Sequence, residues 1–228
     1  MRATVERLRL PSLVGKSVLD IGAWDGYYSF EAERRGAVRV VALDHFVWSI
    51  DREAATRSGP HNLPPDEKPE VWRPEELPGK RGFDLARREL GSGVESIVAD
   101  FVTVDLETLG TFDVVLFLGV LYHLKDPFGA LRRLSHVTSG VAVIASDAAV
   151  FPGFEERALC EFFESDERGG DPTNWWAPNL RALTGMCRAA GFRRVEVVQG
   201  PPAAASDAQP GTAPVRYRAI VHAGMRPE

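Results

Sequence analysis

The sequence has few cysteines and no long apolar run. Cys160 and Cys187 are the two cysteines among 228 residues, and they lack the CxxC spacing of a zinc site or the density of a disulfide framework. No apolar stretch approaches the roughly 20 residues that cross a bilayer, and residues 1–10 alternate charged with apolar side chains instead of forming a signal-peptide core. We therefore expect a cytoplasmic protein with reduced cysteines and no membrane partner.

An excess of positive charge is also missing. Lysine and arginine number 27 against 32 aspartate and glutamate residues, so the net charge is -5, and the sequence pI is about 5.6. Proteins held mainly by nucleic-acid phosphates usually have the opposite balance. The composition therefore disfavours an RNA partner without excluding one, and no feature of the sequence indicates an oligomeric state.

The remaining composition is that of an ordinary globular protein, with 44% hydrophobic and 26% charged residues. Its length suits a single domain over residues 1–228. Apolar runs typical of strands alternate with stretches typical of helices, which indicates βαβ units around a parallel sheet. We predict an α/β fold with a doubly wound, mostly parallel seven-stranded sheet. The predicted strands are 17–21, 39–43, 96–99, 112–117, 141–145, 193–198 and 217–221, and the predicted helices are 28–35, 83–90, 127–134 and 179–190.

Two segments are longer than the connections that such a fold needs. Residues 45–81 hold six prolines and two tryptophans, and residues 151–178 end in the motif DPTNWWAP. Prolines remove hydrogen-bond donors and disfavour helix, so these segments are predicted to be structured loops. Both follow the carboxyl ends of predicted strands, where open α/β sheets bind ligands. We therefore predict two lid-like insertions within the one domain.

The motif VLDIGAWDG joins the first predicted strand to the first helix. A dinucleotide enzyme would have the pattern GxGxxG, but Trp24 and Tyr27 stand at its second and third glycines. Asp20 precedes the turn, where its carboxylate can receive the ammonium of an amino-acid tail but would repel a pyrophosphate. This favours S-adenosylmethionine (SAM) over a nicotinamide dinucleotide. The alternative is that Asp20 and Gly22 only shape a strand-to-helix turn.

Two further carboxylates follow the next strands. Asp44 ends the second strand, where a carboxylate can accept both ribose hydroxyls, although it could equally cap a helix. Asp100 and Phe101 follow the third strand and could bind the adenine amino group beside an aromatic surface. The order of turn, ribose acid and adenine pair is the one expected for SAM.

The fourth strand continues as FDVVLFLGVLYHLKDP. Together with LDIGAWDGYYSF and NWWAPN, it resembles class I SAM-dependent methyltransferases, and within them the bacterial group similar to the tRNA wobble-uridine carboxymethyltransferase. The resemblance implies a SAM pocket lined by Gly22, Asp44, His45, Phe46, Asp100, Phe101, Leu118 and Tyr122. With the residues around the two turns, the predicted cofactor set also includes Asp20, Ala23, Trp24, Gly26 and Gly119.

The wobble-uridine enzymes use a carboxylated SAM, held by basic residues of which some lie in a long N-terminal extension. This chain reaches its first strand by Ser17, so we expect ordinary SAM as the cofactor and S-adenosylhomocysteine (SAH) as its product. No metal is expected, because no Asp/Asn cluster has ligand spacing.

Methyl transfer needs alignment and, for some acceptors, a base. His123 is the first candidate base, since its unperturbed pKa near 6.5 suits that role; alternatively, it fixes the loop before Pro127. Asp147 is the second candidate, with a solvated loop carboxylate as its alternative. Candidate substrate-binding residues are Tyr27, Tyr28, Asn174, Trp175 and Trp176, although the last three could simply pack a lid onto the core.

The function predicted from the sequence is methyl transfer from SAM to an oxygen, nitrogen or carbon of a small-molecule acceptor, such as a metabolite or natural product. A tRNA-modifying methyltransferase and a SAM-binding module without catalysis remain alternatives. A nicotinamide dehydrogenase is disfavoured by the glycine pattern.

Overall fold

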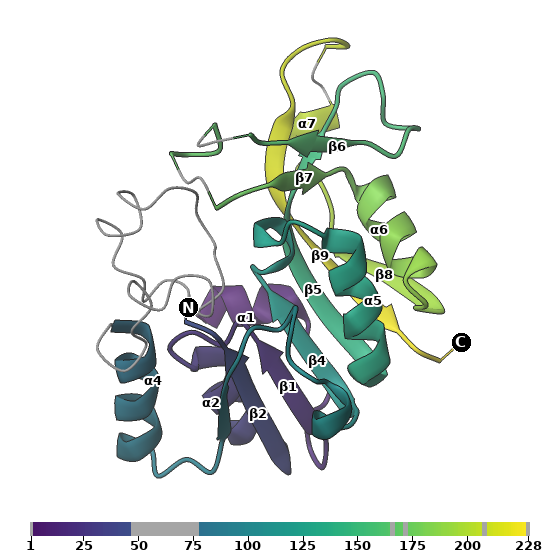
Figure 1. Ribbon diagram of the computed structural model, residues 1–228. Coiled ribbons are helices and arrows are strands. Elements are labelled where there is room, and N and C mark those ends of the chain that lie inside the picture. Colours follow the sequence, from purple (N-terminus) through teal and green to yellow (C-terminus); the bar gives the residue numbers. More distant parts are fainter. Residues whose placement is uncertain (1, 47–77, 165–166, 171–172, 207–208, 227–228) are drawn as a thin grey trace. The chain divides into compact units, whose positions relative to one another are not determined.

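The computed structural model describes residues 2–46, 78–164, 167–170, 173–206 and 209–226 (Figure 1). Seven strands form one sheet in the order β3-β2-β1-β4-β5-β9-β8, and β6 pairs with β7 in a second, two-stranded sheet. The predicted α/β fold with a mostly parallel seven-stranded sheet is confirmed. The chain divides into two compact units, residues 12–112 and residues 1–11 with 113–228.

The unit of residues 12–112 contains three parallel strands, β1 (Ser17–Ile21), β2 (Arg39–Asp44) and β3 (Glu95–Val98). The apolar residues of β1 and β2 are buried, as expected for strands covered on both faces. Helices α2 (Tyr27–Arg34) and α4 (Pro78–Glu89) and the short 3₁₀ helix η2 (Glu107–Leu109) complete this unit. The three strands run in one direction, so their carboxyl ends lie at one edge.

The other unit is built on an antiparallel ribbon. Strand β5 (Thr138–Val150) pairs with β9 (Val215–Gly224) over ten residue pairs, and β9 also pairs with β8 (Arg194–Gln199). Strand β4 (Phe112–Leu118) is followed by the 3₁₀ helix η3 (Leu121–His123). The remaining elements are α1 (Arg2–Leu8), α5 (Pro127–Val137), α6 (Leu180–Ala189), α7 (Ala203–Ser206), β6 (Cys160–Phe162) and β7 (Trp176–Pro178).

Side-chain caps explain where two of these helices begin. The Asp126 carboxylate accepts a hydrogen bond from the Gly129 amide at 2.7 Å, and Pro127 occupies the first turn of α5, where its missing N–H costs nothing. Asn179 caps α6 by accepting from the Ala182 amide at 2.8 Å. These local signals place both helices within one residue of their predicted starts.

Several elements are longer in the structure than predicted, among them β5, β9, α4 and α5. Strand β5 begins at Thr138, before the predicted 141–145, and it continues beyond that range because β9 pairs with it as far as Val150. Helix α4 begins at Pro78, five residues before the predicted start, with proline in a position that helices tolerate. The sequence does not predict β6 and β7, whose three residues each are too short for a periodic pattern.

The structure describes most of one predicted insertion and little of the other. Residues 47–77 of the insertion 45–81 lie outside the described residues. The insertion 151–178 follows β5 and carries β6 and β7, which pair from Cys160 with Pro178 to Phe162 with Trp176. Apart from residues 165–166 and 171–172, this segment is described, and its role as a lid stays a prediction.

Gly26 is a position where a side chain should not fit. Its φ is +82°, and a Cβ there would lie 2.6 Å from ring atoms of both Phe30 and Phe83. We expect Gly26→Ala to lower the free energy of unfolding by about 2 to 4 kcal/mol, because it combines a left-handed backbone with overpacking. Gly82→Ala is the matched control in α4, where the nearest atom would be 3.9 Å away. It should raise the free energy of unfolding by up to about 1 kcal/mol. Urea unfolding measures both, and equal stabilities would contradict this packing.

Candidate active site

The turn after β1 uses its amides within the protein. The amides of Gly22 and Ala23 donate to the Leu43 carbonyl at 2.8 and 3.4 Å, and the Trp24 amide donates to Oδ2 of Asp44 at 2.8 Å. A phosphate-binding turn would instead present such amides to a ligand. The turn is therefore a poor cradle for a pyrophosphate, in agreement with the failed dinucleotide pattern.

Asp44 connects the ends of three strands. Its side chain is buried and accepts from the Trp24 amide, after β1, and from the Phe46 amide at 2.5 Å. Its carbonyl accepts from the Ala99 amide, after β3, at 3.1 Å. Burial raises the pKa of the Asp44 carboxyl, against the lowering effect of the nearby His45 and of the backbone N–H groups. Asp44 thus has a structural role, because its hydrogen bonds join the ends of β1, β2 and β3.

Asp20 is a buried carboxyl with an unusual proton affinity. Its Oδ2 accepts from the Ser29 hydroxyl at 2.7 Å. Burial raises the pKa of Asp20 from 3.8 to about 7, and the negative charge of Asp44 adds to this, whereas the Ser29 hydrogen bond lowers it. A cation bound beside Asp20 would favour its ionised form.

The other predicted cofactor residues of this unit gather around the same strand ends. Asp100 accepts from the Val102 amide at 2.8 Å, and Phe101 beside it is buried. His45 is half-buried, and Phe46 has a φ of +54°.

The aromatic residues that flank the turn pack within the protein. The Trp24 indole packs against Gly79 in the first turn of α4, since a Cβ on Gly79 would lie 2.3 Å from it. Tyr27 and Tyr28 lie on α2 with their rings edge to face at 5.1 Å. The predicted substrate role of the two tyrosines stays a prediction.

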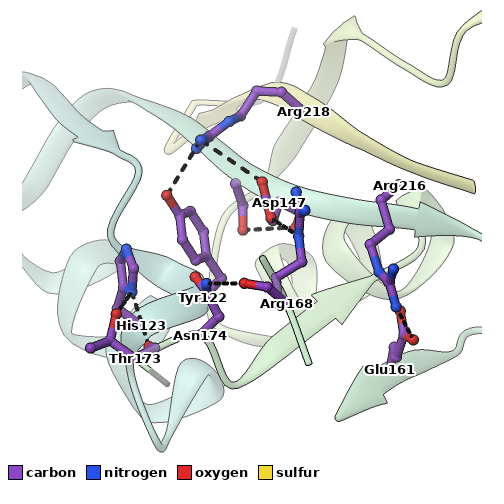
Figure 2. Close-up of polar contacts among 10 residues, drawn as sticks. Tyr122, His123, Asp147, Glu161, Arg168, Thr173, Asn174, Arg216 and Arg218 are labelled. Atoms are coloured by element: carbon purple, nitrogen blue, oxygen red, sulfur yellow. Dashed lines mark hydrogen bonds and ion pairs between the residues drawn. The ribbon is translucent and has the colours of Figure 1, made fainter. Parts of the chain in front are cut away.

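The unit that contains residues 113–228 holds the second group of predicted residues. Leu118 ends β4, Gly119 follows with a φ of +83°, and Tyr122 and His123 lie on η3. Nδ1 of His123 lies 2.9 Å from the Thr173 carbonyl oxygen, as Figure 2 shows. The carbonyl only accepts, so this contact favours the tautomer with the hydrogen on Nδ1 and Nε2 as the basic nitrogen. The Thr173 hydroxyl lies 3.0 Å from the same Nδ1 and can donate to it in the other tautomer.

The segment with Asn174, Trp175 and Trp176 packs onto the loop of His123. The Trp175 amide donates to the Tyr122 carbonyl at 2.8 Å, and Nε1 of Trp176 donates to the Leu124 carbonyl at 3.1 Å. Nε1 of Trp175 is buried without a hydrogen-bond partner in the described part of the chain. Native proteins rarely leave such a donor unpaired, so it is a candidate contact for a ligand oxygen.

Asp147 is held between two arginines (Figure 2). Its Oδ2 accepts from Nε of Arg168 at 2.8 Å, and its Oδ1 lies 3.8 Å from Nη2 of Arg218. The same Nη2 donates to the Tyr122 hydroxyl at 3.3 Å. With only 13% of its side chain exposed, Asp147 is an ion-pair partner and not a solvated loop carboxylate. Its predicted role as a base stays a prediction.

Sequence reasoning missed Arg168 and Arg218. Arg218 faces Asp147 directly because the two residues are partners in the register of β5 and β9. Reading this pair from the sequence would require knowing that β9 runs antiparallel to β5 and at which register. Arg168 lies in the insertion 151–178, and its carbonyl accepts from Nδ2 of Asn174 at 3.2 Å.

The described residues form neither a metal site nor a membrane-spanning helix. They contain no group of three or more His, Cys, Asp or Glu side chains placed to hold a metal ion. None of the helices among them is long and apolar enough to cross a membrane.

Comparison with known proteins identifies the family of the chain. A family model described as a methyltransferase domain matches residues 1–197, and the chain belongs to this methyltransferase domain family. The predicted resemblance of the chain to class I SAM-dependent methyltransferases is confirmed for the family and for the fold.

Curated relatives are named tRNA U34 carboxymethyltransferase. The protein of Alteromonas mediterranea is 27% identical over 193 residues, which cover 82% of this chain and 47% of the relative. That of Campylobacter hominis is 26% identical and covers 82% of this chain and 53% of the relative. The chain therefore spans about half the length of the curated relatives it matches.

Solved structures show the same fold at low sequence identity. The N-terminal domain of EvdMO1, crystallised in the presence of SAH and D-fucose, has a TM-score of 0.62 and 21% identity, over 99% of this chain and 81% of that chain. A SAM-dependent methyltransferase from Mesorhizobium loti has a TM-score of 0.56 and 18% identity, over 97% of both chains. The fold is therefore that of SAM-dependent methyltransferases.

Proposed function

We propose that the protein is a SAM-dependent methyltransferase that transfers a methyl group to an oxygen, nitrogen or carbon of a small-molecule acceptor, with a cytoplasmic location. Membership of the methyltransferase domain family supports the reaction class. The observation that carries the proposal is the set of acids at or near the carboxyl ends of three successive parallel strands. Asp44 is joined by hydrogen bonds to the turn after β1 and to the end of β3.

The residues at this edge fit the groups that SAM presents. Asp20 would receive the ammonium of the methionine tail, directly or through water, and Asp44 would accept the ribose hydroxyls. Asp100 would accept the adenine amino group beside the ring of Phe101. The occupied amides of the turn suit a cofactor that has no phosphate.

When bound, SAM supplies a methyl carbon activated by a sulfonium, which keeps the electron pair of the broken bond and becomes the neutral thioether of SAH. The residues near Tyr122 would align the acceptor. Nδ1 of His123 contacts the carbonyl and the hydroxyl of Thr173, and the carbonyl contact favours the tautomer with a basic Nε2. For a hydroxyl or ammonium acceptor, Nε2 would take the proton and pass it to water.

We expect His123→Gln to lower kcat at pH 7 by about 100-fold or more for a hydroxyl acceptor, because a general base contributes at least that factor. The dissociation constant of SAH should change little. Steady-state kinetics with SAH release as the readout, together with calorimetry, separates the two effects. If the melting temperature falls while kcat is kept, His123 serves the loop and not the reaction.

Charge pairing on α2 supports a small acceptor over RNA. Arg34 and Arg35, which could have formed a basic rim, both pair with Glu31 at 2.7 Å. The net charge of -5 points the same way. The second candidate function, modification of tRNA, is favoured by the names of the curated relatives.

Calorimetry with SAM and SAH tests the proposal. Micromolar binding of both, followed by SAH formation with at least one small acceptor, would support it. Binding of SAM without SAH formation for any acceptor would favour a module without catalysis. Absence of SAM binding would refute the proposal, and binding of NADH would favour a dehydrogenase instead. Retention of tRNA on the protein at low salt, lost at high salt, would select the tRNA reaction.

A further inference from the structure

The cluster of Arg168, Asp147 and Arg218 has one more positive than negative charge. Both guanidinium groups pair with the one carboxylate, and neither pairs with another acid in the part of the chain that the structure describes. Arg216, two residues before Arg218 on β9, pairs instead with Glu161 through two hydrogen bonds. That second pair is neutral, so the excess charge belongs to the Asp147 cluster.

The exposed members of this cluster are the arginines. Their side chains are 33% and 43% exposed, whereas Asp147 is 13% exposed beneath them. Arg168 is bound tightly through Nε, and Arg218 is held at the longer distance of 3.8 Å. A guanidinium has five N–H donors in a planar fork that matches carboxylate and phosphate oxygens. Most of these donors make no hydrogen bond to the described residues.

The cluster lies beside residues predicted to act in the reaction. Arg218 donates to the Tyr122 hydroxyl, and its guanidinium carbon lies 5.1 Å from the centre of the Tyr122 ring. The rings of Tyr122 and His123 are 4.2 Å apart. A Cβ on Gly119 would lie 3.6 Å from both Nη1 of Arg218 and the Tyr122 hydroxyl. Tyr122 therefore lies between Arg218 and the candidate base His123, and it connects the arginine cluster to the residues proposed for the reaction.

We propose that Arg168 and Arg218 bind an anionic group, carboxylate or phosphate, of the methyl acceptor, with the Tyr122 hydroxyl as a further donor. This inference rests on the proposed function for the identity of the ligand as the acceptor. It narrows the substrate class to small acids and phosphorylated compounds. Asp147 contacts both guanidinium groups, one through each of its carboxylate oxygens, and so holds both arginines at one place.

Three ring compounds of similar shape test the site. Benzoate and phenyl phosphate carry the anionic group, and benzamide replaces the charge with a neutral amide. Each is titrated at low salt by ligand-observed NMR, once with the free protein and once at saturating SAH. We expect benzoate or phenyl phosphate to bind at least tenfold more tightly than benzamide. The tighter of the two anions tells a carboxylate acceptor from a phosphorylated one.

Variants connect the binding to the cluster. Arg218→Gln and Arg168→Gln should each weaken anion binding at least tenfold, and the control Arg216→Gln should leave it within twofold. Equal binding of benzoate and benzamide, or equal losses in all three variants, would overturn the proposal. The titration without SAH tests the anion site on its own. A failure of the methyltransferase assignment would show separately, because the wild type would then not bind SAH.

Two further outcomes would assign the arginines to the cofactor and also overturn the proposal. In the first, Arg218→Gln weakens SAH binding tenfold or more. In the second, a carboxylated SAM binds the wild type at least tenfold more tightly than SAM, and Arg218→Gln removes that gain. Unchanged SAM and SAH affinities in Arg218→Gln, with loss of anion binding, are the result that the acceptor role requires.

Discussion

Replacing Asp44 by alanine is expected to weaken SAH binding by a factor of about 100 to 10,000. Two hydrogen bonds from ribose hydroxyls to an ionised carboxylate contribute about 1.5 to 3 kcal/mol each, and 1.4 kcal/mol corresponds to a tenfold change. The carboxylate also accepts from the amides of Trp24 and Phe46. Its removal leaves both amides without this acceptor, so the free energy of unfolding should fall by about 2 to 4 kcal/mol.

Two variants separate the cofactor role from the structural one. Asp44→Asn keeps an oxygen that can accept from the Trp24 amide, so it should retain more stability than alanine and still lose at least tenfold in SAH affinity. Glu95→Ala removes a carboxylate at the start of β3 that pairs with Arg39 at 2.9 Å, and it should leave SAH affinity unchanged. Calorimetry and urea unfolding give the two readouts. An Asp44→Ala protein that binds SAH like the wild type would remove Asp44 from the cofactor site.

The second large effect is a pH dependence of SAM affinity that originates at Asp20. The pKa of Asp20 is raised to about 7, and an ammonium bound beside it would lower this pKa. Binding then releases a proton wherever free Asp20 is protonated. The dissociation constant of SAM should fall about tenfold for each unit of pH up to about 7 and level off above it. Calorimetry between pH 5.5 and 8 measures this slope.

The stability of the free protein should follow the opposite course. A carboxyl with a higher pKa in the folded than in the unfolded chain binds more protons when folded, so the free energy of unfolding falls as pH rises from about 4 to 7. The shift from 3.8 to about 7 corresponds to an upper value of about 4 kcal/mol. Asp20→Asn should therefore be more stable than the wild type at pH 8 and equal to it near pH 4, while it loses the pH dependence of SAM binding.

Ser29→Ala provides a control with a predicted direction. The Ser29 hydroxyl donates to Oδ2 of Asp20 and lowers its pKa, so its removal should move the midpoint of the affinity curve to higher pH. A SAM affinity that is independent of pH in the wild type would show that Asp20 does not receive the ammonium.

The sequence predicts which acids lie at the carboxyl ends of the parallel strands, because its signals there are local. Asp20, Asp44 and Asp100 each follow an apolar run of a parallel strand, and parallel strands bring their carboxyl ends to one edge. The strand contacts that join Asp44 to Trp24 and Ala99 then follow from the register. The sequence does not predict that the carboxylates of Asp20 and Asp44 also accept hydrogen bonds from within the protein.

The arginine cluster escapes sequence reasoning for a physical reason. Asp147 and Arg218 lie on strands far apart in the chain, and their contact depends on the register of an antiparallel pair. Arg168 comes from an irregular segment between β6 and β7, where no periodicity guides a prediction. The same holds for the contacts between His123 and Thr173, which hold the imidazole ring through Nδ1.

The ribbon of β5 and β9 also suggests how such an enzyme could change its acceptor. Asp147 and Arg218 face each other in a ladder of ten residue pairs, and the hydrogen bonds of such a ladder join backbone groups and not side chains. If the arginines bind the acceptor as proposed above, exchanging this one facing pair would alter the charge that the acceptor meets, while the glycine turn and the carboxylates in residues 12–112 keep their sequence. Selection could then act on acceptor choice and on cofactor affinity as two separate traits of one gene.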